Sequence, residues 1–97
     1  MEVTVLVGCK EKSKEIVETL MKKGLASFVY LIEGVRAFRK GKKEEREDLI
    51  IFETDWILIG KCINEMKNVT KEISILGTFQ VKGIRFLRDM FGLSFRK

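Results

Sequence analysis

The chain has 97 residues, of which 45% are apolar, and a net charge of +5 at neutral pH. This length fits one domain, so we expect residues 1–97 to fold as a single unit. No apolar run approaches the ~20 residues of a transmembrane helix, and the first residues do not resemble a secretory signal, which predicts a cytoplasmic protein without a membrane partner. The absence of histidine and of a Cys-x-x-Cys pair argues against a zinc site and a Cys–His nucleophile.

Charged residues make up 34% of the chain, mostly lysine and glutamate, and amide side chains are few. This bias is typical of proteins from hot environments. The two cysteines are far apart in sequence, beside apolar residues, and we expect both to be small buried thiols without a disulfide.

The first part of the chain predicts a strand and a helix. Alternating valines predict a strand over Glu2–Val7, which Gly8 ends. Ser13 is expected to cap a helix with apolar residues at helical spacing, and Gly24 is a good helix stop.

The middle of the chain predicts one long hairpin. A nearly continuous apolar run predicts a second strand over Ala26–Ile32, and Asp48–Thr54 predicts a third. Gly34 interrupts the first run, Val35–Arg39 can continue it as an extended arm, and Lys40–Lys42 is a turn signal.

The last part predicts two helices and a strand. Asp55 or Thr54 is expected to open a helix whose apolar face carries Trp56, Ile59, Ile63 and Met66, with Trp56 in the core or in an interface. A fourth strand is predicted over Ile73–Val81, followed by a short C-terminal helix over Ile84–Phe91.

These elements predict an α+β, ferredoxin-like β-α-β-β-α-β sandwich with an extended hairpin. Right-handed crossovers place both main helices on one face of the sheet and leave the other face open. The strands are too apolar for that face to lie in water, since it must receive several of Leu6, Phe28, Tyr30, Ile32 and Leu76. An exposed apolar patch of this size usually marks an interface, so we expect a homo-oligomer.

The stretch Leu20–Leu31 resembles the helix-to-strand signature of the CutA family, in which a helix ends in Gly-Leu-Ala before a strand of small residues and valine. The Gly-Lys turn at Lys40–Glu45 and the strand Asp48–Thr54 are also similar to that family. The resemblance covers roughly Met1–Met66, and it implies a trimer of ferredoxin-like subunits, related in shape to the PII signalling proteins and linked to divalent-cation tolerance.

The chain departs from the family pattern at three places. Arg39 stands where the family has an aromatic residue before the turn glycine, and Glu53 stands where it has lysine. The His-Pro-Tyr segment before the last strand is missing, and Asn68–Thr70 occupies that region.

The hairpin tip concentrates the candidate binding residues. We expect an arm for assembly or binding, in which Phe38 anchors into a neighbour and the basic groups meet acidic residues or a phosphate. The members of this arm are Arg36, Phe38, Arg39, Lys40, Lys42, Lys43 and Arg46. The acidic group Glu44, Glu45, Glu47 and Asp48 is a candidate for a hard divalent cation, although nearby lysines make that costly. A solvated loop with mutually offset charges is the remaining interpretation.

No catalytic centre is recognisable, so we expect a non-enzymatic, trimeric CutA/PII-like protein that binds a divalent cation or a small anionic ligand. The alternative is a nucleic-acid-binding module that uses its basic surface and the strand aromatics Phe28, Tyr30, Phe52 and Phe79. No RNP-like motif accompanies those aromatics, and binding that falls steeply with salt would distinguish this alternative.

Overall fold

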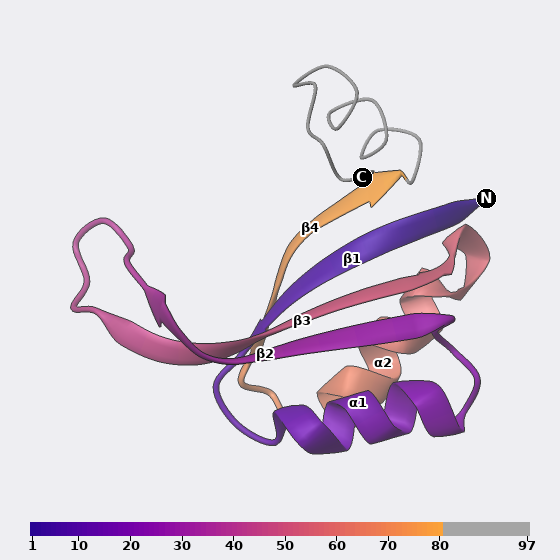
Figure 1. Cartoon of the computed structure of the whole chain (residues 1–97), viewed down its shortest axis with the longest axis horizontal. Helices are drawn as coiled ribbons and strands as arrows, with labels where there is room; N and C mark the ends of the chain where they lie inside the picture. The colour runs from indigo at the N-terminus through magenta and orange to yellow at the C-terminus, as the bar shows by residue number, and fades with distance from the viewer. Residues whose placement is uncertain (81–97) are drawn as a thin grey trace, which may run out of the picture.

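The computed structural model describes residues 1–80, which form a four-stranded sheet with two helices on one face (Figure 1). The elements are β1 (Glu2–Cys9), α1 (Ser13–Lys22), β2 (Phe28–Ala37), β3 (Glu45–Asp55), the 3-10 turn η1 (Trp56–Leu58), α2 (Ile59–Val69) and β4 (Ile73–Gln80). The ferredoxin-like α+β prediction is therefore confirmed. The predicted helix Ile84–Phe91 and the end of the fourth strand at Val81 lie outside the described residues.

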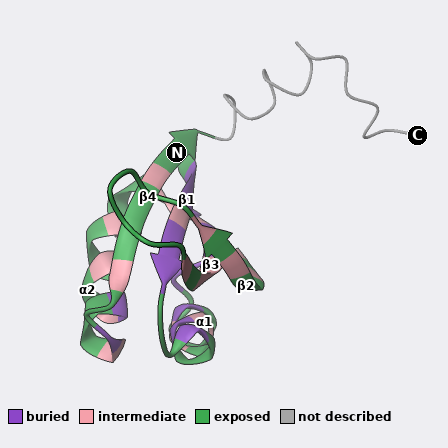
Figure 2. Ribbon diagram, turned by 90° about the vertical axis from the view of Figure 1, so that its left-hand side faces the viewer, coloured by how far each residue is buried: buried purple, intermediate pink, exposed green. Residues whose placement is uncertain are grey.

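The strand order in the sheet is β2-β3-β1-β4, and every neighbouring pair is antiparallel. Each helix connects two strands that have a third strand between them. Both helices lie on the same side of the sheet (Figures 1 and 2), as two crossovers of the same hand require. The opposite side of the sheet is left without a helical layer.

The core lies between the sheet and the two helices. Because side chains alternate along a strand, Val3, Val5 and Val7 of β1 all face the helices and are buried. The other fully buried residues of this layer include Ile50 and Phe52 of β3, Ile16 and Leu20 of α1, and Cys62 and Met66 of α2. Burying each large apolar side chain contributes about 1.5–3 kcal/mol, so this layer is the main source of stability.

Strand β1 extends beyond Gly8, so the prediction that this glycine ends the strand is wrong. Gly8 pairs with Leu49, and Cys9 pairs with Asp48. A Cβ atom on Gly8 would lie 2.7 Å from Oε1 of Glu47. A larger residue at this position would displace the end of the Glu47 side chain, a close approach that the local sequence does not reveal.

Ser13 is the first residue of α1 rather than its cap, so that prediction is also wrong. The cap position is Lys12, in a left-handed conformation with φ of 59°. The buried Ser13 hydroxyl instead donates a hydrogen bond to Oδ2 of Asp48 on β3. Gly24, with φ of +64°, follows the helix as expected.

The long hairpin is confirmed, including its predicted continuation past Gly34, although β2 ends at Ala37 instead of Arg39 and β3 begins at Glu45 instead of Asp48. The β2–β3 register shifts between Ile32 and Val35, where Gly34 takes φ of +71°. The Gly34 N–H donates to Oδ1 of Asp48 over 3.0 Å. Beyond this bulge the ladder resumes and continues to the pair Ala37–Glu45. The chain therefore crosses the glycine without closing the hairpin.

Trp56 lies outside the core, because it precedes α2 instead of belonging to it. Asp55 caps the turn η1 by accepting a hydrogen bond from the Ile57 N–H at 3.1 Å. This turn leaves Trp56 59% exposed. Met66 is fully buried and Ile63 packs against the core, so the apolar face was predicted correctly only for the helix proper.

Candidate functional site

The candidate arm is the part of the β2–β3 hairpin that follows Gly34, and it projects past the body of the molecule (Figure 1). Phe38 lies near its tip and is 69% exposed. The guanidinium carbon of Arg36 lies 5.3 Å from the centre of the Phe38 ring, which is a cation–π contact. An aromatic ring is thus held in water at the end of a projecting strand pair.

Two arginines of the arm are paired within the chain. Arg36 binds Glu44 through two nitrogens, and Arg39 donates to Glu47 from Nη1 and Nη2 over 2.8 and 3.3 Å. Hydrogen bonding to these carboxylates raises the pKa of both guanidiniums. At these two arginines the charges are offset within the chain, as expected if the hairpin tip is a solvated loop.

The other basic residues of the arm have fewer polar partners than Arg36 and Arg39. Lys40, Lys42 and Lys43 form no ion pair with any of residues 1–80. Arg46 lies on β3, where its Nη1 is 3.5 Å from the carbonyl oxygen of Gly34. The three lysines give the arm a positively charged tip.

The structure does not gather all four acidic residues that were candidates for a cation: Glu45 and Glu47 both lie near Nη1 of Arg39, at 3.6 and 2.8 Å, whereas Glu44 binds Arg36. Glu47 extends over Gly8, and Asp48 accepts hydrogen bonds from Ser13 and Gly34. Because these two neighbours lie on one strand, their side chains point to opposite faces of the sheet. Within the described part of the chain, no three acidic or cysteine side chains gather as metal ligands.

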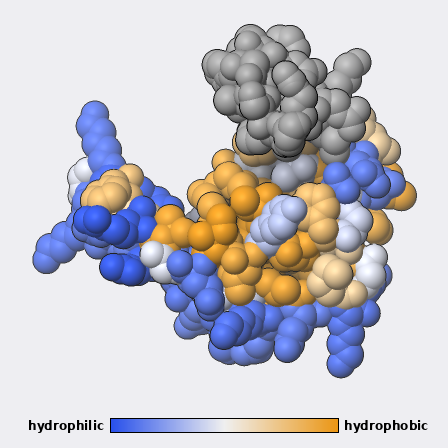
Figure 3. Space-filling view, viewed as in Figure 1, coloured by the Kyte–Doolittle hydropathy of each residue, from blue (hydrophilic) through white to orange (hydrophobic). Residues whose placement is uncertain are grey.

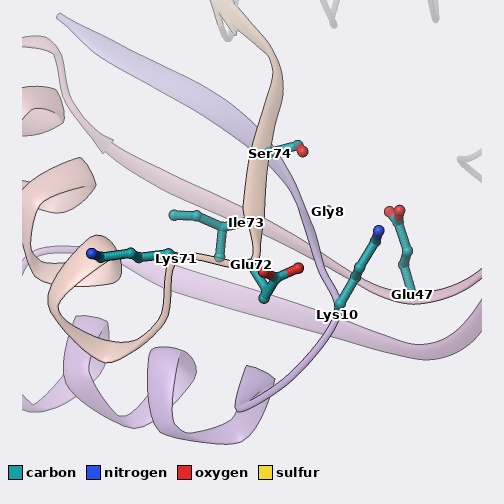
Figure 4. Close-up of a pocket in the computed structure, with 7 residues that line it drawn as sticks. All are labelled: Gly8, Lys10, Glu47, Lys71, Glu72, Ile73 and Ser74. Carbon is teal, nitrogen blue, oxygen red and sulfur yellow. The ribbon is translucent and has the colours of Figure 1, made fainter.

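A polar depression of about 190 Å³ lies at the base of the arm (Figure 4). Its lining residues are Gly8, Lys10, Glu47, Lys71, Glu72, Ile73 and Ser74. In Figure 4, Lys10 and Glu47 lie next to each other, whereas Lys71 points away from them. A second depression of about 140 Å³ shares Lys10, Glu47 and Ser74 and adds Arg39, Lys42 and Glu45. Both are lined by charges of either sign: basic and acidic side chains are equal in number in the first, and basic side chains exceed acidic ones by one in the second.

Sequence reasoning missed Lys10, Lys71 and Ser74 as members of this site. The β1–β4 pairing places Ser74 beside Gly8, while Lys10 and Lys71 lie in the loops that adjoin these strand ends. The strand order alone could have indicated that these segments meet. No local motif identifies them.

The sheet face opposite the helices, which we call the uncovered face, carries Leu6, Phe28, Tyr30, Ile32, Leu76 and Phe79. Tyr30 is 62% exposed, and its ring lies 5.2 Å from that of Phe28 between centroids. Figure 3 shows a broad hydrophobic area over the sheet, beside the hydrophilic hairpin. Phe52 faces the helices and is fully buried. It is therefore not available for base stacking, which the nucleic-acid-binding alternative expects of the strand aromatics.

Both cysteines are free and buried. The thiol of Cys9 donates to the carbonyl oxygen of Glu11 at 2.8 Å, and that of Cys62 lies 3.6 Å from the Thr54 hydroxyl. Burial removes each thiol from water, which disfavours the charged thiolate and is the largest cause of the raised pKa of both cysteines. A raised pKa makes a thiol a poor nucleophile near neutral pH.

No helix among residues 1–80 is long and apolar enough to cross a bilayer. No protein-family model and no curated protein sequence matches the chain.

Solved structures with the same fold are numerous, and several are CutA proteins. The divalent cation tolerance protein Cut A1 of Thermus thermophilus is 24% identical, with a TM-score of 0.68 over 92% of this chain and 93% of that one. CutA of Pyrococcus horikoshii is 22% identical, with a TM-score of 0.69 over 90% and 96%. The periplasmic divalent cation tolerance protein CutA of Archaeoglobus fulgidus is 18% identical, with a TM-score of 0.63 over 79% and 83%.

At these identities the likeness concerns the fold. The chain has the ferredoxin-like fold of the CutA proteins, as its sequence resemblance implied.

Proposed function

We propose that this protein is a non-enzymatic homotrimer that assembles through its arm and its uncovered face. The uncovered face is the observation that carries the proposal, because Tyr30, Ile32 and Leu76 are all exposed there. An apolar area of this kind costs free energy in water, and burial against another subunit recovers about 25 cal/mol for each Å². The trimer is the assembly that the resemblance to the CutA family implies.

The arm supports the same proposal. A two-stranded ribbon that projects into water is marginally stable, and its edges offer unpaired backbone groups. The hairpin nevertheless continues beyond the bulge at Gly34, with Phe38 at its tip. Contact with a neighbouring subunit would stabilise the ribbon and remove Phe38 from water.

The test compares two exposed apolar residues on opposite sides of the molecule. Ile32 on the uncovered face is 46% exposed, and Met21 on α1 is 48% exposed. Ile32→Glu is expected to reduce the particle mass measured by light scattering to that of one chain, because a buried charge disrupts an interface. Met21→Glu is the matched control and is expected to keep the assembled mass. An Ile32→Glu variant that stays assembled would contradict the proposal.

A small ligand at the base of the arm is the second part of the proposed function. The two polar depressions contain the basic residues Lys10, Arg39, Lys42 and Lys71 and the carboxylates of Glu45, Glu47 and Glu72, and the excess of one positive charge favours a small anion. The printed names of the similar proteins refer to divalent cations, so Mg²⁺ and inorganic phosphate are the probes for calorimetry. A heat of phosphate binding that is lost in Lys10→Ala supports an anion site, whereas a heat of binding with Mg²⁺ alone points to the carboxylates instead.

The free, buried thiols favour the cytoplasm as the location of the protein.

Nucleic-acid binding is the alternative function. Tyr30 and Phe79 are exposed on the uncovered face, where bases could stack. The buried Phe52 removes one of the four aromatics on which that hypothesis depended. Salt-dependent binding of single-stranded RNA by a monomer would favour this alternative over a closed trimer.

A further inference from the structure

We propose that Phe38 of one subunit docks into an apolar depression at the far end of the sheet of a second copy of this chain. The depression, which we call the end depression, has a volume of about 250 Å³ and is lined by Met1, Val3, Trp56, Thr78, Phe79 and Gln80. This inference rests on the proposed self-assembly, and it adds which two surfaces meet.

The end depression is suited to an aromatic side chain. Trp56, Met1 and Phe79 line it, and all three are large apolar residues exposed to solvent. An apolar cavity of about 150 Å³ is sufficient to bind benzene. The end depression therefore has room for the ring of Phe38, and burial of that ring would cover Trp56 as well.

The charges around the two surfaces are complementary. Glu2 lies directly opposite Asp55 in the β1–β3 ladder, next to Met1 and Trp56 of the depression. Two like charges in directly opposed positions are destabilising, and neither forms an ion pair within residues 1–80. The arm tip carries Lys40, Lys42 and Lys43 a few positions after Phe38 in the sequence, so docking would bring this basic segment towards the acidic pair.

The two surfaces lie at opposite ends of the sheet, so one chain cannot join them. The arm begins where Val35 pairs with Glu47, its ladder ends at the pair Ala37–Glu45, and the depression adjoins the pair of Glu2 and Asp55. Glu45 and Asp55 are the two ends of β3, which are separated by roughly 33 Å at ~3.3 Å per residue. A contact between two different patches is heterologous, and repetition of it closes a ring of three when each step rotates the subunit by a third of a turn.

Trp56 allows a direct optical test, because it is the only tryptophan of the chain. Phe38→Ala is expected to shift the Trp56 emission to the red and to weaken association, since water then enters the end depression. Ile57→Ala is the matched control, because Ile57 is 80% exposed beside Trp56 and does not line the depression. This control is expected to retain both the emission and the mass of the wild type.

The outcomes separate this inference from the proposed assembly. A wild-type protein that is monomeric would overturn both. An assembled wild type whose emission and mass are unchanged by Phe38→Ala would overturn only the docking of Phe38. Wild-type emission that stays the same when the assembly is diluted to monomers would mean that the depression is filled from within the chain, and this would also overturn the inference.

Crosslinking tests the direction of the contact independently. In a Phe38→Cys, Gln80→Cys double variant, oxidation is expected to join each arm to the next subunit and to give a covalent trimer on a non-reducing gel. A two-fold exchange of arms would link the same two chains twice and give only covalent dimers, which would contradict the ring. The native thiols are buried and serve as an internal control in the unsubstituted chain, which is expected to stay uncrosslinked.

Discussion

The two thiols show how burial changes chemistry at single residues. Cys9 ends β1 and Cys62 lies in α2, and burial raises the pKa of both above the ordinary value of 9.0. For Cys9, the carboxylates of Asp48, Glu11 and Glu47 add to this effect. The folded protein therefore holds these thiol protons more tightly than the unfolded chain does.

This difference predicts a loss of stability at alkaline pH. A raised folded-state pKa contributes stability below the unfolded value, and that contribution is lost as the pH rises through the folded-state pKa. Urea unfolding is expected to require less denaturant at about pH 10 than at about pH 8. A Cys9→Ala, Cys62→Ala variant is the control and should lose less stability over the same interval. An equal loss in both proteins would show that other groups are responsible.

Several residue-level features were predictable from the sequence, and others were not. The alternating Val3, Val5 and Val7 indicated the buried side of β1, because a strand has a period of two. The position of Ser13 suggested a helix cap, yet its hydroxyl donates a hydrogen bond to Asp48, which lies 35 positions further along the chain. Lys10 and Ser74 meet at the base of the arm only through strand pairing, so no local pattern could identify them.

Asp48 links three elements, and it determines how the arm leaves the sheet. Its carboxylate accepts from the Ser13 hydroxyl at the start of α1 and from the Gly34 N–H at the β2 bulge. The bulge bends the hairpin just before the arm begins. Asp48 is therefore placed to fix the direction of the arm relative to the body.

Removal of the Asp48 carboxylate is expected to lower the free energy of unfolding. Asp48→Ala leaves the buried Ser13 hydroxyl without its partner, a loss that typically costs about 1–3 kcal/mol, and it also frees the exposed Gly34 N–H, which water can still satisfy. Asp48→Asn keeps one acceptor and should have a smaller effect. Glu44→Ala removes an exposed partner of Arg36 at the tip and should change stability least. Thermal unfolding measures this order, and an Asp48→Ala variant as stable as Glu44→Ala would refute the linking role.

Element boundaries show where local patterns fail. The hairpin and its continuation past Gly34 were recognisable from the apolar runs, but the bulge, where Asp48 accepts the Gly34 N–H, was not. The helical period suggested that Trp56 shares a face with Met66, whereas the turn η1 separates it from α2. In both cases a contact or a cap outside the periodic segment decides the structure.

The whole molecule combines a well-packed core on one side of the sheet with an apolar surface on the other (Figures 2 and 3). The order of elements and the apolar strands were sufficient to predict this asymmetry. The sequence also suggested four carboxylates as one cation group, but the strand alternation distributes Glu47 and Asp48 to opposite faces. The fold and the exposed apolar face were thus more predictable than any ligand site.

The solution mass of the unmodified chain tests the central proposal most directly. Light scattering at micromolar concentration is expected to give three times the chain mass of 11.2 kDa. The mass should be the same with and without Mg²⁺, because the contacts proposed for assembly are apolar surfaces and ion pairs between side chains. A stable particle with the mass of a single chain would contradict the account.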